Sequence, residues 1–323
     1  MTGDLASPVT TELDVRMCFR LLLDRPPNPE EWAGHSAQAG QALGKVVAGY
    51  VNSLEFSRRN LLQPAADGAP QVADYPGFRI HAAPGDIQIG RHVLDGAYEP
   101  EVTAVFHQVL RPGMAVIDIG ANIGFFSMLS AALVGPGGAV LAVEPNGENA
   151  RLLEASRRLN GFGHVTTAQV AAGDALGLLQ LNTTHSNGTT SAPGTELGQL
   201  LQARTVPCIP VDSLVAAAWA PGRRADLIKV DVEGAEYKAL RGAAGVIARD
   251  RPLIISEFSP TFMPGISGID GPGYLRWLHA QGYAIAAIRP DGPPLEAGQD
   301  VDAVMGEFER RNLDHIDLLA TPT

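Results

Sequence analysis

The stretch AVIDIGANIGFFSMLSA, residues 115–131, decides the fold. It begins as an apolar run typical of a buried strand, and it continues with the apolar spacing of a helix. Between the two halves, Gly120 permits a sharp turn or a close backbone approach, and Gly124 permits the helix to pack tightly on the strand. Such a corner between a strand and a helix commonly binds a ligand in α/β proteins, so its residues should indicate the ligand.

The turn has the pattern D-x-G-x-N-x-G, formed by Asp118, Gly120, Asn122 and Gly124. It matches neither the dinucleotide pattern G-x-G-x-x-G nor the phosphate loop G-x-x-x-x-G-K-[ST]. Asp118 would repel a pyrophosphate, but it can accept hydrogen bonds from a cationic amino-acid group or from water. Glu144 ends the next apolar run, where its carboxylate can bind a ribose diol. A ligand with a ribose, a positive charge and no phosphate is S-adenosylmethionine.

Short apolar runs alternate with amphipathic helical segments along the second part of the chain. The helical segments include 146–159 and 235–249, and the predicted strands are 115–120, 139–144, 164–170, 226–232 and 252–258. This alternation predicts an α/β fold with a parallel, doubly wound sheet, in which Asp118 and Glu144 share the ligand-binding edge. The polar segment 182–195 predicts a long loop on the ligand side or a disordered one.

Composition narrows the function classes. The 323 residues carry a formal net charge of −11 without a basic run, which disfavours nucleic-acid binding and favours a small neutral or glycosidic substrate. Cys18 and Cys208 lie far apart and the histidines lack metal-binding spacing, so neither a redox pair nor a histidine metal site is expected. No apolar run approaches the ~18 residues of a membrane helix. The start has no secretory signal pattern, so we expect a cytoplasmic protein.

The first part of the chain differs from the rest in the spacing of its apolar residues and in its composition. Residues 11–60 show helical periodicity, interrupted by a turn after which Pro29 can begin a new helix, and residues 61–77 are rich in Ala, Pro and Gly. We therefore predict a helical bundle at 1–62, a linker at 63–77 and the α/β domain at 78–323. The bundle either covers an apolar face, mediates formation of a homodimer, or has a separate role.

Three motifs occur in an order that resembles the FkbM-type family of S-adenosylmethionine-dependent methyltransferases. They are DGAYEPEVTAVFHQVLRPGMAVIDIGANIGFFSMLSAALVGPGGAVLAVEPN at 95–146, DLIKVDVEGAEYKALRGA at 226–243 and LIISEF at 253–258. The resemblance spans roughly residues 80–320. It implies a Rossmann-like sheet of seven strands and O-methylation of a hydroxyl on a sugar or natural product. The bundle sequences at 16–35 and 46–60 are similar to a small helical domain found in bacterial surface-glycan proteins, which suggests a bacterial enzyme of glycan assembly.

The resemblance also implies roles for individual residues. The cofactor loop would comprise Asp118, Gly120, Asn122 and Gly124, and Glu144 would contact the ribose. Tyr98 and Glu99 would lie near the cofactor, although a helix start, where an acid is favoured by the helix dipole, explains them equally well. The segment from Ala171 to Asp174 would approach the adenine ring.

The motif IKVDVEGAEYKAL, residues 228–240, supplies the candidates for chemistry. Asp231 ends a predicted strand, where it can act as a general base or orient the acceptor, and Glu233 is the second candidate. His185 in the polar loop is the third, although a surface histidine explains it better. Glu236 is explained by a helix first turn without any catalytic role. Mg²⁺ shared by Asp231 and Glu233 stays an open alternative, without a clear motif for it.

Other functions stay open at the level of sequence. N-methylation or carboxyl methylation is the first alternative, because a neutral amine needs no general base. A non-catalytic protein that binds an adenosyl ligand is the second, since a fold does not guarantee a reaction. The presence of Asp118, Glu144 and Asp231 favours an enzyme acting on a small-molecule or glycan hydroxyl.

Overall fold

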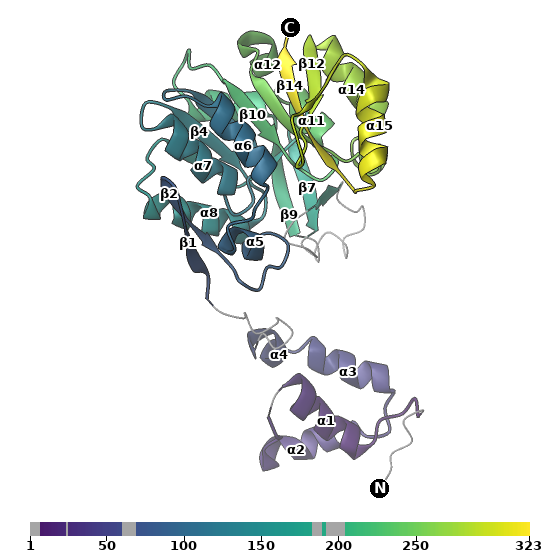
Figure 1. Cartoon of the computed structure of the whole chain (residues 1–323). Coiled ribbons are helices and arrows are strands. Elements are labelled where there is room, and N and C mark those ends of the chain that lie inside the picture. The colour runs from purple at the N-terminus through teal and green to yellow at the C-terminus, as the bar shows by residue number, and fades with distance from the viewer. Residues whose placement is uncertain (1–6, 24, 60–68, 183–188, 192–203) are drawn as a thin grey trace. The chain divides into compact units, whose positions relative to one another are not determined.

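A computed structural model describes residues 7–23, 25–59, 69–182, 189–191 and 204–323 (Figure 1). The chain divides into two compact units, Met1–Asp67 and Gly68–Thr323. Within the described residues, no helix has the length and apolar character needed to cross a membrane.

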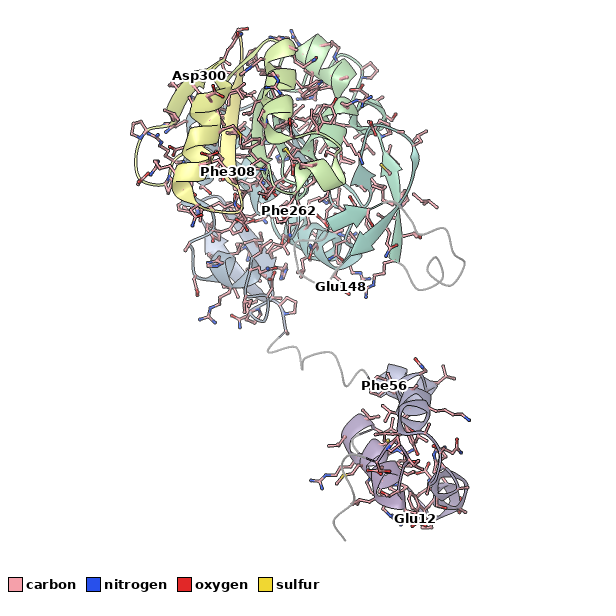
Figure 2. All side chains as sticks on the ribbon, turned by 90° about the vertical axis from the view of Figure 1, so that its right-hand side faces the viewer. Glu12, Phe56, Glu148, Phe262, Asp300 and Phe308 are labelled. Carbon is pink, nitrogen blue, oxygen red and sulfur yellow. The ribbon has the colours of Figure 1, made fainter. Side chains whose placement is uncertain are left out.

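The first unit is a bundle of short helices, as the periodicity predicts. The helices are α1 (Glu12–Leu22), α2 (Pro29–Ser36), α3 (Leu43–Val51) and α4 (Leu54–Arg59). Thr11 and Asn28 cap α1 and α2 with reciprocal hydrogen bonds, and Pro29 occupies the first turn of α2. The small core contains Val15, Phe19, Val46, Tyr50 and Phe56, the last labelled in Figure 2.

Arg25 joins three segments of this bundle. Its Nε atom donates to Glu55 Oε1 of α4 over 2.6 Å, and its guanidinium also bonds the carboxylate of Glu31 in α2. The same guanidinium lies 5.0 Å from the ring centroid of Phe19 in α1. Charged side chains therefore reinforce a core that contains few residues.

The second unit is an α/β domain with one large sheet. The strand order is β13-β12-β14-β11-β10-β3-β4-β5, and β3, β4, β5, β10 and β11 run parallel. The strands are β3 (Ala115–Ile119), β4 (Ala139–Val143), β5 (Val165–Ala168), β10 (Leu227–Val230), β11 (Leu253–Phe258), β12 (Tyr283–Ala287), β13 (Leu295–Gly298) and β14 (Ile316–Pro322). The five strands predicted from apolar runs are all present.

Helices cover both faces of this sheet, so the fold is the predicted doubly wound type (Figure 1). Alternate residues of β3 show why: Ile117 and Ile119 join the core on one face, whereas Val116 joins the core on the other. One face carries α6 (Pro100–Val109), α7 (Phe125–Val134) and α8 (Gly147–Leu159). The other carries α10 (Val211–Ala218), α11 (Glu236–Arg241), α12 (Ala244–Asp250), α14 (Gly271–Ala280) and α15 (Val301–Arg311).

The structure adds to the predicted sheet in two ways. The seven strands from β5 to β12 are followed by an eighth, the short edge strand β13, which pairs antiparallel to β12. Strand β14 runs antiparallel to both of its neighbours, so the sheet is not wholly parallel. The predicted helix at 235–249 is divided into α11 and α12 by a turn at Gly242 and Ala243. Gly242 packs closely on Gly173, since a Cβ at Gly242 would lie 2.0 Å from the carbonyl oxygen of Gly173.

Small elements surround the main sheet. A second sheet has the order β6-β9-β7-β8, and its strand β8 falls in the polar segment predicted as a loop. The remaining elements are β1 (Gln71–Tyr75), β2 (Phe78–Ala82), α5 (Gly90–Leu94), β6 (Ala171–Ala172), β7 (Gly177–Asn182), β8 (Thr189–Ser191), β9 (Arg204–Ile209) and α13 (Met263–Ile266).

Strand β1 lies inside the range predicted as a linker, 63–77, and pairs with β2. Tyr75 stacks on Phe78 with ring centroids 5.1 Å apart, and its hydroxyl donates to the Val93 carbonyl over 2.6 Å. These contacts attach the hairpin to the α/β unit, so a linker between the two units is shorter than the composition suggests.

We propose that the α/β unit folds without the bundle. A chain starting at Ala69, which keeps β1, should unfold cooperatively by circular dichroism, because the contacts of Tyr75 are retained. A chain starting at Gly77 is the matched comparison, and its melting temperature should be lower because it lacks the hydrogen bond and ring stacking of Tyr75. Aggregation or non-cooperative unfolding of the chain starting at Ala69 would show that the bundle is part of the same folding unit.

Candidate active site

A cavity lies where β3, β4, β10 and β11 end, and the predicted site residues converge on it. Nine of them line it: Tyr98, Glu99, Asp118, Gly120, Asn122, Glu144, Ala171, Asp231 and Glu233. Thr190, from the segment predicted as a ligand-side loop, lines it as well. The cavity therefore occupies the expected ligand-binding edge of an α/β sheet.

The two glycines of the opening stretch have different neighbours. Gly120 has a φ of +81°, and a Cβ there would lie 1.8 Å from the carbonyl oxygen of Asp231. This close approach holds the turn after β3 against the end of β10. Gly124 has a φ of +95°, and its Cβ would lie 2.7 Å from Leu153 Cγ on α8. Gly124 thus allows α8 to pack closely on the turn, whereas the sequence predicted close packing of a helix on the strand. Gly124 does not line the cavity.

Glu144 joins the turn after β3 to the turn after β4. Its Oε2 accepts a hydrogen bond from the backbone N–H of Asn122 over 2.8 Å, and its Oε1 accepts one from that of Asn146 over 2.7 Å. Burial raises the pKa of Glu144 to about 7. Since an ionised carboxylate has about four acceptor positions, it retains capacity for two hydroxyl donors of a ligand.

Asp118 has an oxygen with no partner in the described part of the chain. Its Oδ2 accepts from Ser127 Oγ over 2.6 Å, whereas Oδ1 is buried without a hydrogen bond. Burial raises the pKa of Asp118, and Lys229 opposes this effect. A buried acceptor without a partner beside a cavity is available to a hydrogen-bond donor of a ligand.

Lys229, which the sequence analysis did not select, is the buried cation of the site. Its Nζ donates to Asp231 Oδ2 over 2.7 Å and lies 4.7 Å from the ring centroid of Phe126. Burial acts to lower the pKa of Lys229, but Asp231, Glu99 and Asp118 together raise it. Burial acts to raise the pKa of Asp231, but Lys229 lowers it overall. Both groups are therefore charged at neutral pH.

Three further cavity residues were also missed, namely Glu257, His315 and Asp317. Glu257 is in β11, and Asp317 is its register partner in β14. Because β14 runs antiparallel to β11, its first residues lie beside the end of β11. Asp317 was missed because the candidates were taken from the carboxyl ends of predicted strands, whereas Asp317 lies at the start of one. Glu257 lies next to the last residue of the predicted strand LIISEF, so its position at a strand carboxyl end could have identified it.

The other sequence candidates lie elsewhere or are held by the backbone. The carboxylate of Asp174 lies 3.5 Å from Arg241 and does not line the cavity. Glu236 accepts from the backbone N–H groups of Val232 and Gly234, both over 3.0 Å, so it holds the loop as the capping interpretation predicts. His185 lies outside the described residues.

The charge of the cavity is acidic. Among the residues that the structure describes, its lining carries two basic side chains, Lys229 and His315, against seven carboxyl groups: Glu99, Asp118, Glu144, Asp231, Glu233, Glu257 and Asp317. These negatively charged hydrogen-bond acceptors favour binding of a cation that carries a ribose, and they repel a phosphate group. In the described ranges no group of three or more His, Cys, Asp or Glu side chains is arranged to hold a metal ion, and we assign no metal ligand.

Comparisons with solved structures give low similarity. FkbM from Methylobacillus flagellatus KT is 16% identical with a TM-score of 0.40, and the match covers 71% of this chain and 52% of that one. The chain thus spans about half the length of that protein. M. jannaschii TYW2, solved in complex with AdoMet, is 14% identical with a TM-score of 0.42, over 80% of this chain and 87% of that one.

No curated protein matches the chain. The family described as Methyltransferase FkbM domain matches residues 118–285, which is just over half of the chain. The match begins at Asp118 and includes the ends of β3, β4, β10 and β11 that form the cavity. The chain belongs to the FkbM family of S-adenosylmethionine-dependent methyltransferases.

Proposed function

We propose that this protein transfers the methyl group of S-adenosylmethionine to a hydroxyl of a sugar, glycoconjugate or natural product. The observation that carries the proposal is the acidic cavity, which combines ligand-binding acceptors on Asp118 and Glu144 with the ionised Asp231. When bound, the cofactor would supply an electrophilic methyl group on a cationic sulfur.

Asp118 and Glu144 are the residues that would hold the cofactor. Asp118 Oδ1 offers a buried acceptor to the cationic amino-acid part, and Glu144 offers its remaining acceptor positions to the ribose hydroxyls. Tyr98, Glu99 and Ala171 complete the lining that the family resemblance implies. The excess of carboxyl groups favours a ligand with positive charge over the neutral product that remains after methyl transfer.

Asp231 is better suited to orient the acceptor than to remove its proton. Lys229 keeps the pKa of Asp231 below its ordinary value, so the carboxylate is a good hydrogen-bond acceptor but a weak base at neutral pH. In-line methyl transfer depends mainly on aligning the acceptor oxygen with the methyl carbon, and a fixed carboxylate can do this. Glu233 follows in the same loop and also faces the cavity.

The charge of the cavity favours a hydroxyl over the alternative acceptors. An amine would be held as an ammonium ion by the surrounding carboxylates, and an ammonium ion has no lone pair to accept a methyl group. A carboxylate or phosphate group on the acceptor would be repelled by Asp231 and its neighbours, which also disfavours nucleic acid. The similarity of the bundle to domains of surface-glycan proteins supports a glycan-type acceptor in a bacterium.

The proposal predicts release of S-adenosylhomocysteine with hydroxyl compounds. In a screen of glycosides and natural-product alcohols, with amines and carboxylic acids as parallel arms, turnover should occur in the hydroxyl arm and yield methyl ethers by mass spectrometry. Asp231→Asn should lower kcat ~10²-fold or more with nearly unchanged cofactor affinity, because the acceptor loses its anionic partner.

Two controls make this screen decisive. Glu233→Gln should cause a smaller loss of kcat, and the melting temperature of Asp231→Asn checks that Lys229 without its partner does not unfold the site. Turnover with amines alone would establish N-methylation. Cofactor binding with no turnover in any arm would support the non-catalytic alternative, and loss of activity with chelator would indicate a metal.

A second prediction concerns Glu144. Glu144→Gln should weaken S-adenosylmethionine binding by about one to two decades in calorimetric titration, because an amide oxygen replaces a carboxylate that serves two backbone N–H groups and the ribose. Glu148→Gln is the matched control, since Glu148 lies in the first turn of α8, the helix that follows Glu144, with its side chain 65% exposed (Figure 2). Equal affinity in the two variants would remove Glu144 from the cofactor site.

A further inference from the structure

We propose that Glu257 is the proton-exchanging residue of the cavity: it holds a proton while the cavity lacks a cation, and it releases that proton when the cofactor's sulfonium enters. The inference rests on the proposed function, because it takes the sulfonium as the cation that binds here. It assigns a role to a residue that the sequence analysis did not select.

Glu257 is a buried carboxyl group of the cavity and, like Asp118, has one oxygen without a hydrogen bond. The residue is 6% exposed and lines the cavity. Its Oε1 accepts a hydrogen bond from Ser259 Oγ over 2.7 Å, whereas the buried Oε2 receives none from the residues that the structure describes. A buried carboxylate oxygen without a donor is costly, and a bound proton removes that cost because the oxygen then donates instead.

The elements packed around Glu257 bring mostly negative charge. Asp231 and Glu233, in the loop after β10, line the same cavity, and Asp317 is the register partner of Glu257 in β14. The negative charges of Asp231, Glu233 and Glu236, the last in α11, raise the pKa of Glu257. Lys229 is already bound to Asp231. His315 Nδ1 lies 3.6 Å from Glu257 Oε1 but only 2.8 Å from Asp314 Oδ1, so its charge is shared with another acid.

These surroundings place the proton on Glu257 rather than on Asp231. Two neighbouring carboxyl groups in a buried cavity repel each other when both are ionised, so one of them holds a proton. Burial, followed by the charge of Asp231, raises the pKa of Glu257 well above its ordinary value. Lys229 has the opposite effect on the pKa of Asp231. The pair is therefore a carboxylic acid beside a carboxylate.

An entering cation reverses this preference. A positive charge in the cavity stabilises the ionised form of each nearby carboxyl group, so Glu257 loses its Oε2 proton to solvent and becomes a carboxylate. The total charge is conserved, because the cation replaces the proton. Glu257 then has a vacant acceptor position that can take up the proton lost by a hydroxyl acceptor, with a basicity closer to neutral pH than that of Asp231.

Calorimetry of the full chain tests this exchange. S-adenosylmethionine and S-adenosylhomocysteine are titrated near pH 7 in phosphate and in imidazole buffer, whose ionisation enthalpies differ, so the difference in heat gives the protons released. With S-adenosylmethionine we expect release of about half a proton or more, and affinity that rises with pH, by up to about tenfold per unit for one proton. S-adenosylhomocysteine lacks the sulfonium charge and should release much less.

Variants identify the group that exchanges. Glu257→Gln mimics the protonated acid and should abolish most of the release while leaving the chain folded. Glu309→Gln, at an exposed position in α15, should behave as the unaltered chain. Glu99→Gln and Glu144→Gln test the rival groups in the cavity, since burial raises the pKa of Glu99 to about 8 and that of Glu144 to about 7.

The outcomes separate the inference from the proposed function. Release that persists in Glu257→Gln, or that disappears only in Glu99→Gln or only in Glu144→Gln, would overturn the role of Glu257. Equal release with both ligands in the unaltered chain would overturn the role of the sulfonium charge without relying on any variant. Binding of S-adenosylmethionine with no proton release would overturn the inference alone, whereas absence of binding would overturn the proposed function and the inference together.

Discussion

The ion pair between Lys229 and Asp231 is the interaction on which the site depends. Lys229 is nearly buried, and its Nζ is fixed between a carboxylate at 2.7 Å and the face of Phe126. Without this cation, Asp231 would share a low-dielectric cavity with other carboxyl groups and would take up a proton. The pair therefore keeps one carboxylate ionised and leaves the protons of the cavity on its neighbours. It also explains how an acidic cavity forms without unfolding the strand ends that carry it.

Backbone contacts bring these side chains together. Gly120 allows the turn after β3 to touch the carbonyl oxygen of Asp231, and a methyl group there would separate the two strand ends. Glu144 then bonds the backbone of the turns after β3 and β4. The proposed cofactor turn and the proposed acceptor-binding residue are thus held at one edge of the sheet by backbone contacts, which fix their relative geometry. Such preorganisation is what alignment of a methyl donor and acceptor requires.

The sequence predicted the parts of this site that follow from local pattern. Asp118, Glu144 and Asp231 each follow or end an apolar run, and the parallel alternation places the ends of those strands at one edge. Lys229 was missed because a lysine within a strand pattern does not by itself indicate a buried ion pair, which Lys229 here forms with Asp231 two residues later. Asp317 was missed because it begins an antiparallel strand, and the direction of β14 is decided by tertiary packing.

The limits of local pattern are equally clear in the fold. The alternation of apolar runs and helices gave the doubly wound architecture, but β13 is a short strand with a partly buried pattern and no apolar run. Strand β1 was not predicted because the alanine, proline and glycine residues around it are typical of a linker. Its residue Tyr75 nevertheless attaches it to the α/β unit by a hydrogen bond to the Val93 carbonyl. Both strands are stabilised by contacts with residues distant in sequence or by pairing at an edge, and neither effect is visible in a window of a few residues.

We propose that the acidic edge of the sheet is the cofactor site. A crystal structure of the full chain grown with S-adenosylmethionine tests this claim most directly. We expect electron density for the cofactor in the cavity between Asp118 and Asp231, with the ribose hydroxyls hydrogen-bonded to Glu144. Cofactor bound elsewhere on the chain, or bound here with its ribose on another residue and Glu144 contacting only the backbone, would contradict it.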